Sequence, residues 1–388
     1  MYNKDVVIGG YAETPIRMRS GRSAYDLAGE AMADLLQRYG IEKSDIDGLS
    51  VSTALSETSN PFYAVYMAES LALTPNWLNQ AGLGGCSAVS GVARAISAIR
   101  DGHCTCVMVI SADAPSSKWQ ANYGMYRPEF QEVAGVGGPP ATFGLLMNRY
   151  RYEYNLDPEA LAKIAVTQRA HALKNENTVP KLRKPLTRKD YFNSKVIAEP
   201  LRVLDSVMFC DGANAVLVTT EEKARELGLK KLIYPTAYAE ITNIGADDPL
   251  IGALSTGTEI VAERLWKASG KRAADIQSFH PYDDFTIAVM MQMEAFGFCE
   301  IGDGSEFVLA TDLSYEGTLP VNTGGGQISA GQPGLAGGGL NLVEAIRQLS
   351  GDGEARQVAR TENALVTGIG VIPYGRNWAS SVAMILEA

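Results

Sequence analysis

The sequence predicts an α/β fold built from two similar halves, and two observations carry that prediction. Apolar, β-branched segments typical of buried strands alternate along the chain with segments of helical periodicity. In addition, the residue pattern of 28–53 recurs at 259–284, and that of 86–112 recurs at 333–351 followed by 362–370. Two copies are too few for a solenoid. We therefore predict a pseudo-twofold α/β core with its active site between the halves.

The elements of the first half follow from the periodicity of apolar residues. We expect strands where β-branched residues run together, and helices where apolar residues recur every three to four positions. The expected strands are residues 6–10, 46–52, 105–112 and 213–219, and the expected helices are residues 24–38, 61–71 and 88–100.

Residues 115–200 differ from the segments on either side, because they are richer in proline, asparagine, tyrosine and charge. We predict that they form a largely helical insertion over one face of the core. The resulting organisation has an N-terminal half of residues 1–114 and 201–222, a loop or cap insertion of residues 115–200, and a C-terminal half of residues 223–388.

Composition and charge exclude several classes of function. The 388 residues include 34 basic and 44 acidic side chains, and the net charge of −10 disfavours nucleic acid as a partner. No apolar stretch approaches the ~18 residues needed to cross a bilayer, and the N-terminus lacks a signal peptide's apolar region. We therefore expect a cytoplasmic protein with no membrane association. The five cysteines form neither a zinc spacing nor a disulfide framework, and we predict no metal site.

Cys86 is the most informative single residue. It follows Gly84 and Gly85 and lies between a predicted strand and the start of a predicted helix. A helix N-terminus stabilises a thiolate, glycines permit a sharp turn, and free N–H groups at that position can hold an oxyanion. Cys86 is therefore either a nucleophile or a small residue buried at a crowded turn, and the local sequence leaves both interpretations open.

A second cluster, residues 279–286, lies where a strand ends and a helix begins, which is a usual place for site residues in α/β folds. His280 and Tyr282 either reach a cleft from this position or are structural residues. For Asp283 and Asp284 we favour a structural role, in which one of them caps the helix that begins just after them.

Glycines gather in two C-terminal segments, residues 322–339 and 367–370. So many glycines indicate positions where the backbone needs a residue without a side chain, for close helix packing, for turns with positive φ, or for close approach of a ligand. A dinucleotide fold is disfavoured, because no acidic residue follows a strand–GxGxxG–helix unit at the right distance. The sequence therefore implies no nicotinamide or flavin cofactor.

Taken together, these segments resemble the thiolase superfamily, specifically the sterol-carrier-protein thiolases and their relatives, over essentially the whole chain. Cys86 matches the family's nucleophilic cysteine, which begins a helix after the third strand. Residues 282–286 match its H/Y-D-x-F-T segment, and residues 322–333 match N-x-x-G-G-x-x-x-x-G-H-P. Residues 368–370 fall at the family's final C-x-G-G motif. Each match is weak alone, but the four in this order are specific.

The resemblance implies a five-layered αβαβα fold, a homodimer and coenzyme A thioesters as substrates. It implies no bound cofactor, with coenzyme A itself as co-substrate. The backbone of Cys86 and Gly370 would form one oxyanion hole, Gln332 and Tyr282 would line the other, and Asn322 would be a further oxyanion or backbone residue. Some relatives also work with a small partner, an OB-fold protein with a zinc ribbon, that helps to admit the acyl-CoA.

Three departures from the family pattern bear on mechanism. The histidine of Gly-His-Pro, which normally activates the nucleophile, is Gln332, and a glutamine cannot take a proton at neutral pH. Gly368 replaces the second, proton-shuttling cysteine, and Tyr282 replaces a histidine or asparagine. The acid/base role is therefore assigned to Tyr282 or His280.

Basic residues of the insertion are weaker site residues. Arg183, Lys184 and Arg188 lie on a stretch that could face the phosphates of coenzyme A. A solvated surface face is the alternative interpretation, and it is the commoner one for such a run of charge.

Three functions remain open at this point. In the leading hypothesis the chain is a thiolase-type acyltransferase, in which Cys86 attacks the ketone of a 3-oxoacyl-CoA, the C–C bond breaks and coenzyme A takes the acyl group. By analogy with the relatives, the acyl group is aryl, branched or steroid-like. The second hypothesis is a retro-aldolase, a lyase of a β-hydroxyacyl-CoA with Tyr282 as base. The third is a non-catalytic subunit of a thiolase and OB-fold partner complex.

Overall fold

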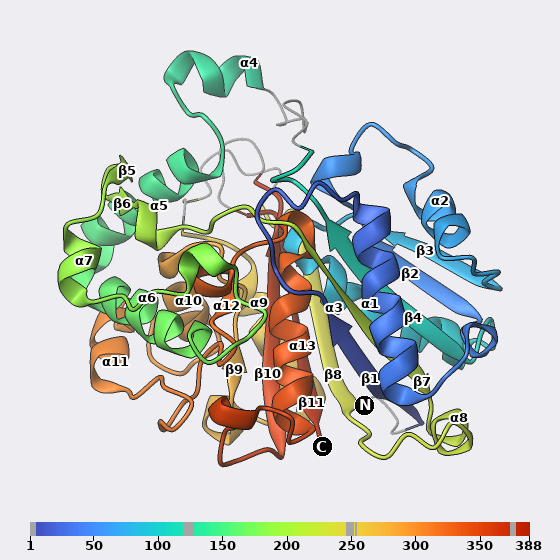
Figure 1. Ribbon diagram of the computed structural model, residues 1–388. Helices are drawn as coiled ribbons and strands as arrows, with labels where there is room; N and C mark the ends of the chain where they lie inside the picture. Colours follow the sequence, from blue (N-terminus) through green and yellow to red (C-terminus); the bar gives the residue numbers. More distant parts are fainter. Residues whose placement is uncertain (1–4, 119–127, 246–251, 253, 373–377) are drawn as a thin grey trace.

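Two β-sheets form the framework of the protein (Figure 1). The structure is a computed structural model that describes residues 5–118, 128–245, 252, 254–372 and 378–388. The first sheet has the strand order β1-β7-β4-β2-β3 and the second has the order β8-β11-β10-β9. The strands are β1 (Val6–Glu13), β2 (Gly48–Ser52), β3 (Trp77–Ala81), β4 (Cys106–Asp113), β7 (Gly212–Thr220), β8 (Tyr234–Thr242), β9 (Phe279–His280), β10 (Asn363–Gly370) and β11 (Ser380–Glu387).

Helices cover both outer faces of the pair of sheets and fill the space between them. On the first outer face lie α1 (Ala24–Tyr39) and α2 (Tyr63–Ser70), and on the second lie α9 (Thr258–Ser269) and α10 (Thr286–Ala295). Figure 1 shows α3 (Ser87–Arg100) and α13 (Gly337–Leu349) between the sheets, where both contact strands of each half. These five layers confirm the predicted αβαβα fold.

A cap packs against the helices of the second half (Figure 1). It contains α4 (Pro128–Gln131), α5 (Pro139–Tyr154), α6 (Pro158–Ala172) and α7 (Arg188–Phe192), followed by a hairpin of β5 (Val196–Ala198) and β6 (Leu201–Arg202). The insertion is therefore largely helical, as its composition suggests. The remaining helices are α8 (Glu221–Glu226), α11 (Gly304–Ala310) and α12 (Gly326–Ala330).

Two of the expected strand boundaries move for identifiable reasons. The first strand does not stop at Gly10 but continues to Glu13, because the two glycines before Tyr11 form an irregularity in register with β7 rather than a turn. The second strand begins at Gly48 rather than residue 46. The Asp47 carboxylate before it accepts hydrogen bonds from the N–H groups of Thr105 and Cys106, which ties it to the next strand.

The central helix α13 is fixed by a buried ionic cluster. Glu344 lies 2.6 Å from Arg347 and 3.1 Å from Arg356, and it accepts a hydrogen bond from Thr323. Burial alone would raise the pKa of Glu344, but Arg356 and Arg347 hold it well below its usual value. Arg347 also pairs with Glu13 of β1, so the cluster joins α13 of the second half to the first sheet.

Candidate active site

The Cys86 turn is built from backbone packed against backbone. A 3-10 turn, Gly84–Cys86, leads directly into α3, and Gly84 has a φ of 58°, which glycine adopts without strain. A side chain on Gly368 would place its Cβ 2.8 Å from the Cα of Cys86. A side chain on Gly370 would collide with the carbonyl of Leu83. The glycines of the final motif therefore let β10 approach this turn closely.

The Cys86 thiol is completely buried and lies among apolar side chains of α3 and the central strands. Its Sγ donates a hydrogen bond to the carbonyl oxygen of Ser380, 3.5 Å away on β11. Burial raises the pKa of the Cys86 thiol well above its usual value, and the carboxylate of Glu240 raises it further. Cys86 is therefore a protonated thiol at neutral pH in this structure.

Tyr282 lies beside the same turn. Its ring packs so closely on Gly85 that a Cβ there would overlap the ring. Its backbone is held firmly, because its N–H donates to Oγ1 of Thr367 at 3.0 Å and its carbonyl accepts from Nε2 of Gln292 at 2.8 Å. Burial raises the pKa of Tyr282 well above its usual value, and the Asp284 carboxylate adds to that shift. The side chain is thus a fixed, neutral phenol.

Gln332 joins Tyr282 in a small polar network. Its Nε2 donates to the Tyr282 hydroxyl at 3.3 Å and to Oε1 of Gln327 at 3.0 Å. Its Oε1 is buried and has no hydrogen-bond partner within the part of the chain that the structure describes. An unpaired buried acceptor is costly in a folded protein, and a substrate hydroxyl could satisfy it.

The two neighbouring aspartates have different surroundings. The Asp283 carboxylate accepts hydrogen bonds from the N–H groups of Gln327 and Ile328 and from Nδ2 of Asn341. It therefore holds the first turn of α12, and not the helix that follows it in sequence. Oδ1 of Asp284 is buried without a hydrogen-bond partner in the described ranges.

The structure does not bring His280 and Asn322 into this network. The His280 ring is fully buried and contacts the Ser278 hydroxyl at 3.2 Å, and burial lowers its pKa to about 4. Asn322 donates from Nδ2 to the carbonyl of Pro281, so it supports the backbone just before Tyr282. Within the described residues, Nδ1 of His280 and Oδ1 of Asn322 are buried without a hydrogen-bond partner, and neither side chain bonds to Tyr282 or Gln332.

The basic residues of the insertion make local contacts. Arg183 donates to the carbonyl of Thr178 at 2.9 Å, and Arg188 pairs with Glu159 of α6. The backbone carbonyl of Lys184 accepts a hydrogen bond from Arg169. These contacts order the cap, and they do not connect the three predicted residues to Cys86 or Tyr282.

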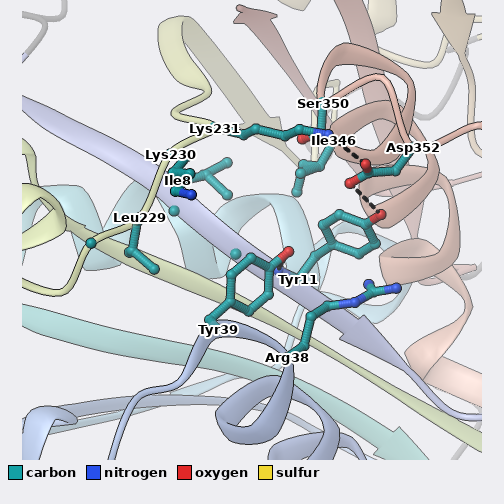
Figure 2. A pocket seen from close by; sticks show the side chains of 13 residues that line it. Ile8, Tyr11, Arg38, Tyr39, Leu229, Lys230, Lys231, Ile346, Ser350 and Asp352 are labelled. Atoms are coloured by element: carbon teal, nitrogen blue, oxygen red, sulfur yellow. Dashed lines mark hydrogen bonds and ion pairs between the residues drawn. The ribbon is translucent and has the colours of Figure 1, made fainter.

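A separate cavity of about 270 Å³ lies at the far end of α13 (Figure 2). Asp352 bridges its rim, because it pairs with Lys231 and accepts a hydrogen bond from the Tyr11 hydroxyl. Arg38 lies over the Tyr11 ring. None of the residues lining the cavity belongs to the turns of Cys86 and Tyr282, so it lies apart from the candidate site.

Two residues of the site carry little signal in the sequence. Gln327, which supports Gln332, lies in the glycine-rich segment and has no motif of its own. The expectation that Asp283 or Asp284 caps the following helix is wrong, because that helix begins at Thr286 with Phe285 as its N-cap and with no side-chain capping bond. The available signal was the adjacency of two aspartates, of which only one is needed for a structural role.

Two fused α/β halves that meet at a cysteine turn define an enzyme of the thiolase type. The model of the family "Thiolase C-terminal domain-like" matches residues 249–388. The chain is 31% identical to the 17-hydroxy-3-oxo-4-pregnene-20-carboxyl-CoA lyase of Mycobacterium tuberculosis, with 96% of this chain and 98% of that protein covered. It is 27% identical to the acetyl-CoA acetyltransferase of Methanocaldococcus jannaschii, with 91% and 92% covered.

A solved structure described as the Ltp2-ChsH2(DUF35) aldolase superposes with a TM-score of 0.86 at 27% identity, covering 100% of this chain and 99% of that one. The chain belongs to the thiolase superfamily, in its sterol-carrier-protein-like branch. It is accordingly a thiolase-like enzyme, a class whose members here include both a lyase and an acetyltransferase.

A membrane-spanning helix or a metal cluster would each bear on function. Within the described ranges, no helix has the length and apolar character needed to span a membrane. Among the same residues, no group of three or more histidine, cysteine, aspartate or glutamate side chains is placed to hold a metal ion.

Proposed function

We propose that the protein is a retro-aldolase that cleaves a β-hydroxyacyl-CoA into a carbonyl compound and a shorter acyl-CoA. The observation that carries this proposal is the contrast between a sealed, protonated Cys86 and an unsatisfied polar network at Tyr282 and Gln332. A retro-aldol reaction needs no covalent nucleophile. It needs a base for the hydroxyl proton, stabilisation of the thioester enolate, and a proton donor for its carbon.

The surroundings of Cys86 do not supply what a thiolase reaction requires. A thiolase nucleophile needs a base that takes the thiol proton, and the group that the Cys86 thiol contacts is the backbone carbonyl of Ser380. The second cysteine of the family has no room, because a side chain at Gly368 would meet the backbone of the Cys86 turn. The described surroundings of Cys86 therefore offer neither a base that accepts the thiol proton nor the family's second cysteine.

Tyr282 supplies the group that a retro-aldol reaction uses. As a neutral phenol it can donate a hydrogen bond to developing negative charge, and then a proton to the enolate carbon. The amide of Gln332 orients its hydroxyl. The relationship to a lyase and to an aldolase supports the same reaction, and it supports a bulky, steroid-like body for the substrate.

A thiolase-type acyl transfer is the second function, and one observation favours it. Cys86 is the N-cap residue of α3, the position at which a helix favours an anion and at which the family carries its nucleophile. In that function coenzyme A is the co-substrate, and Gly370, packed against the Cys86 turn, contributes to the oxyanion hole.

The test is product analysis with matched substrates. Purified protein is incubated with a panel of β-hydroxyacyl-CoA and 3-oxoacyl-CoA thioesters that carry steroid-like, aryl and branched groups. Products are identified by liquid chromatography and the protein by intact mass. We expect a ketone or aldehyde and a shorter acyl-CoA from a β-hydroxy substrate, with no protein adduct. An acyl adduct that is absent in Cys86→Ala and is discharged by coenzyme A would establish acyl transfer instead.

We also propose a homodimer that forms along β3. This strand is the outer edge of its sheet, and an uncovered edge pairs readily with a second copy. Phe62, Val65 and Tyr66 of the neighbouring α2 segment are 62%, 55% and 48% exposed, which leaves an apolar surface beside that edge. Light scattering should give twice the chain mass for the wild type and a smaller mass for Val65→Glu.

The partner that we propose is an OB-fold protein with a zinc ribbon, seated on the cap. Exposed apolar side chains concentrate there, with Val133 and Tyr152 at 85% and 80% exposure. The name of the similar aldolase, Ltp2-ChsH2(DUF35), joins two components, which is consistent with such a complex.

We propose a cytoplasmic location for the protein. All five cysteines are free thiols, which suits a reducing compartment: Cys86, Cys104, Cys106, Cys210 and Cys299.

A further inference from the structure

The proposed cleavage lacks one component. Tyr282 is a neutral phenol, so it can give a proton but does not start the reaction by taking one. The histidine in this region, His280, is turned toward Ser278. A group that removes the proton of the substrate's β-hydroxyl must therefore come from elsewhere near Tyr282.

Asp284 has no structural explanation, in contrast to its neighbour. Asp283 accepts three hydrogen bonds at 3.0–3.3 Å from α12 and α13, and it is fully buried. Asp284 does not cap α10, because the N-cap is Phe285 and no side chain caps that helix. The hydroxyl of Thr286, the first residue of α10, is used by Asp205 instead. Oδ1 of Asp284 is buried and has no hydrogen-bond partner among the residues that the structure describes. Such a group is costly to keep, and such groups concentrate at functional sites.

The position of Asp284 suits a catalytic role. Among the charged groups that act on Tyr282, it has the largest effect. Its backbone carbonyl accepts a hydrogen bond from the N–H of Val207 at 3.2 Å, which anchors it to the segment that returns from the cap. Unlike Asp283, the residue as a whole is only partly buried, although Oδ1 itself is enclosed.

The charges around Asp284 keep its proton affinity high. Burial raises its pKa to about 8, and the neighbouring Asp283 contributes, while the backbone N–H groups of Asp284 and Phe285 oppose the shift. Asp205 on the neighbouring segment is also an acid, bound to Tyr191 and Thr286. No cation acts on Asp284 among the described groups. A carboxylate with this affinity is a better base than an ordinary aspartate.

We propose that the carboxylate of Asp284 is the general base of the retro-aldol reaction, paired with Tyr282 as general acid. This inference rests on the proposed function. The ionised Asp284 takes the β-hydroxyl proton, the oxygen forms the carbonyl, and the electron pair of the Cα–Cβ bond passes into the thioester enolate. Tyr282 donates its proton to Cα, and the proton on Asp284 then returns to Tyr282. No oxidant, reductant or net proton is required.

The test compares Asp284→Asn with an acidic residue outside the site. Asp303→Asn is the matched control, since Asp303 is exposed and makes no side-chain capping bond. We expect kcat/KM of the wild type to rise with pH and to level off above about 8. Asp284→Asn should lower kcat by ~10²–10⁴-fold and abolish that rise, in line with general acid–base contributions. Asp303→Asn should change neither.

Two measurements separate catalysis from structure. Added formate should restore part of the activity of Asp284→Ala, because a small carboxylate can occupy the vacated space. Infrared difference spectra of the wild type should show a protonated carboxyl band that disappears as the pH passes about 8, and Asp284→Asn should lack it.

Asp284→Asn with activity within ~3-fold of the wild type and an unchanged pH profile would overturn the assignment. A folded wild type that cleaves no β-hydroxyacyl-CoA would instead overturn the proposed function itself.

Discussion

The two turns that lead into α3 and α10 place side chains at one junction, but they do so with opposite chemistry. The first turn, Gly84–Cys86, delivers a thiol into an apolar core, where its pKa is raised well above the usual value. The second, residues 281–285, delivers Tyr282 and Asp284 among polar groups that are not fully paired. The motif that looks most reactive in the sequence is therefore the less reactive of the two turns in the structure.

Magnitudes explain why a cysteine at a helix start is not enough. A helix N-terminus stabilises an anion by about 0.3–1 kcal/mol. Complete burial shifts a pKa by up to ~3–5 units, at about 1.4 kcal/mol per unit. For Cys86 the burial effect therefore outweighs both the helix and the charge of Arg94, which lowers the pKa of the thiol. An active thiolate would also need a base in contact with the thiol, and its described hydrogen bond goes to the backbone carbonyl of Ser380.

The largest effect should follow removal of the Tyr282 hydroxyl. In Tyr282→Phe the ring that packs on Gly85 is kept, but the proton donor and the contact with Gln332 are lost. We expect kcat for the β-hydroxyacyl-CoA to fall by ~10²–10⁴-fold while the unfolding midpoint changes little. Steady-state kinetics and thermal unfolding on the same preparation check this. Full activity in Tyr282→Phe would break the contrast between the two turns.

The second prediction sharpens the contrast by restoring the family's other cysteine. In Gly368→Cys the new Cβ would lie 2.8 Å from Cys86 Cα and 2.9 Å from the Gly85 carbonyl oxygen, so the backbone must separate. Overpacking of this kind costs ~1–3 kcal/mol. Denaturant unfolding should show that loss without any gain of thiolase activity. Acyl transfer by this variant would mean that only the second cysteine was missing.

Much of this contrast could not be predicted from the sequence. The repeat, the layer order and the Cys86 turn follow from local periodicity and from motifs, because each depends on residues that are close together in the sequence. The burial of the thiol depends on Ser380, 294 positions away, and the fit of Tyr282 depends on a glycine in the other half. Side-chain roles at such a junction are set by long-range packing, which no local pattern encodes.

The pair of aspartates illustrates the same limit. An aspartate just before a helix is a good cap in sequence terms. Here Asp283 caps α12, a helix that lies more than forty residues further along the chain, and Asp284 caps nothing among the described elements. Similarly, Arg183 and Arg188 form a basic stretch in sequence, yet their side chains are engaged within the cap.

The third prediction concerns the histidines behind the second turn. Burial lowers the pKa of His280 and of His171 to about 4, from 6.5 in the unfolded chain. Between these values the unfolded chain binds more protons, so stability is fully present above pH 6.5 and falls as the pH drops toward 4. At pH 5 each histidine should cost roughly 2 kcal/mol.

Urea unfolding at pH 7 and pH 5 measures this effect. His171 donates from Nδ1 to the carbonyl of Asn322 and accepts at Nε2 from the N–H of Tyr315, a pattern that requires the neutral ring. His171→Gln should therefore lose less stability between the two pH values than the wild type does. An equal loss would show that this ring is not protonated on unfolding, and that acid acts elsewhere, for example on Glu344.

The smallest effect should follow removal of the Cys86 thiol, and it divides the two functions most directly. In Cys86→Ala a buried Sγ and its weak hydrogen bond to Ser380 are lost, which should cost about 1 kcal/mol in the free energy of unfolding. If the chemistry resides at Tyr282 and Asp284, kcat for the β-hydroxyacyl-CoA should stay within ~3-fold of the wild type, because Cys86 takes no part in the proton transfers. A loss as large as that of Tyr282→Phe would return the chemistry to the first turn. In that event, opening of the apolar core around Cys86 on binding of substrate would become a necessary step, since the thiol as it stands is fully enclosed.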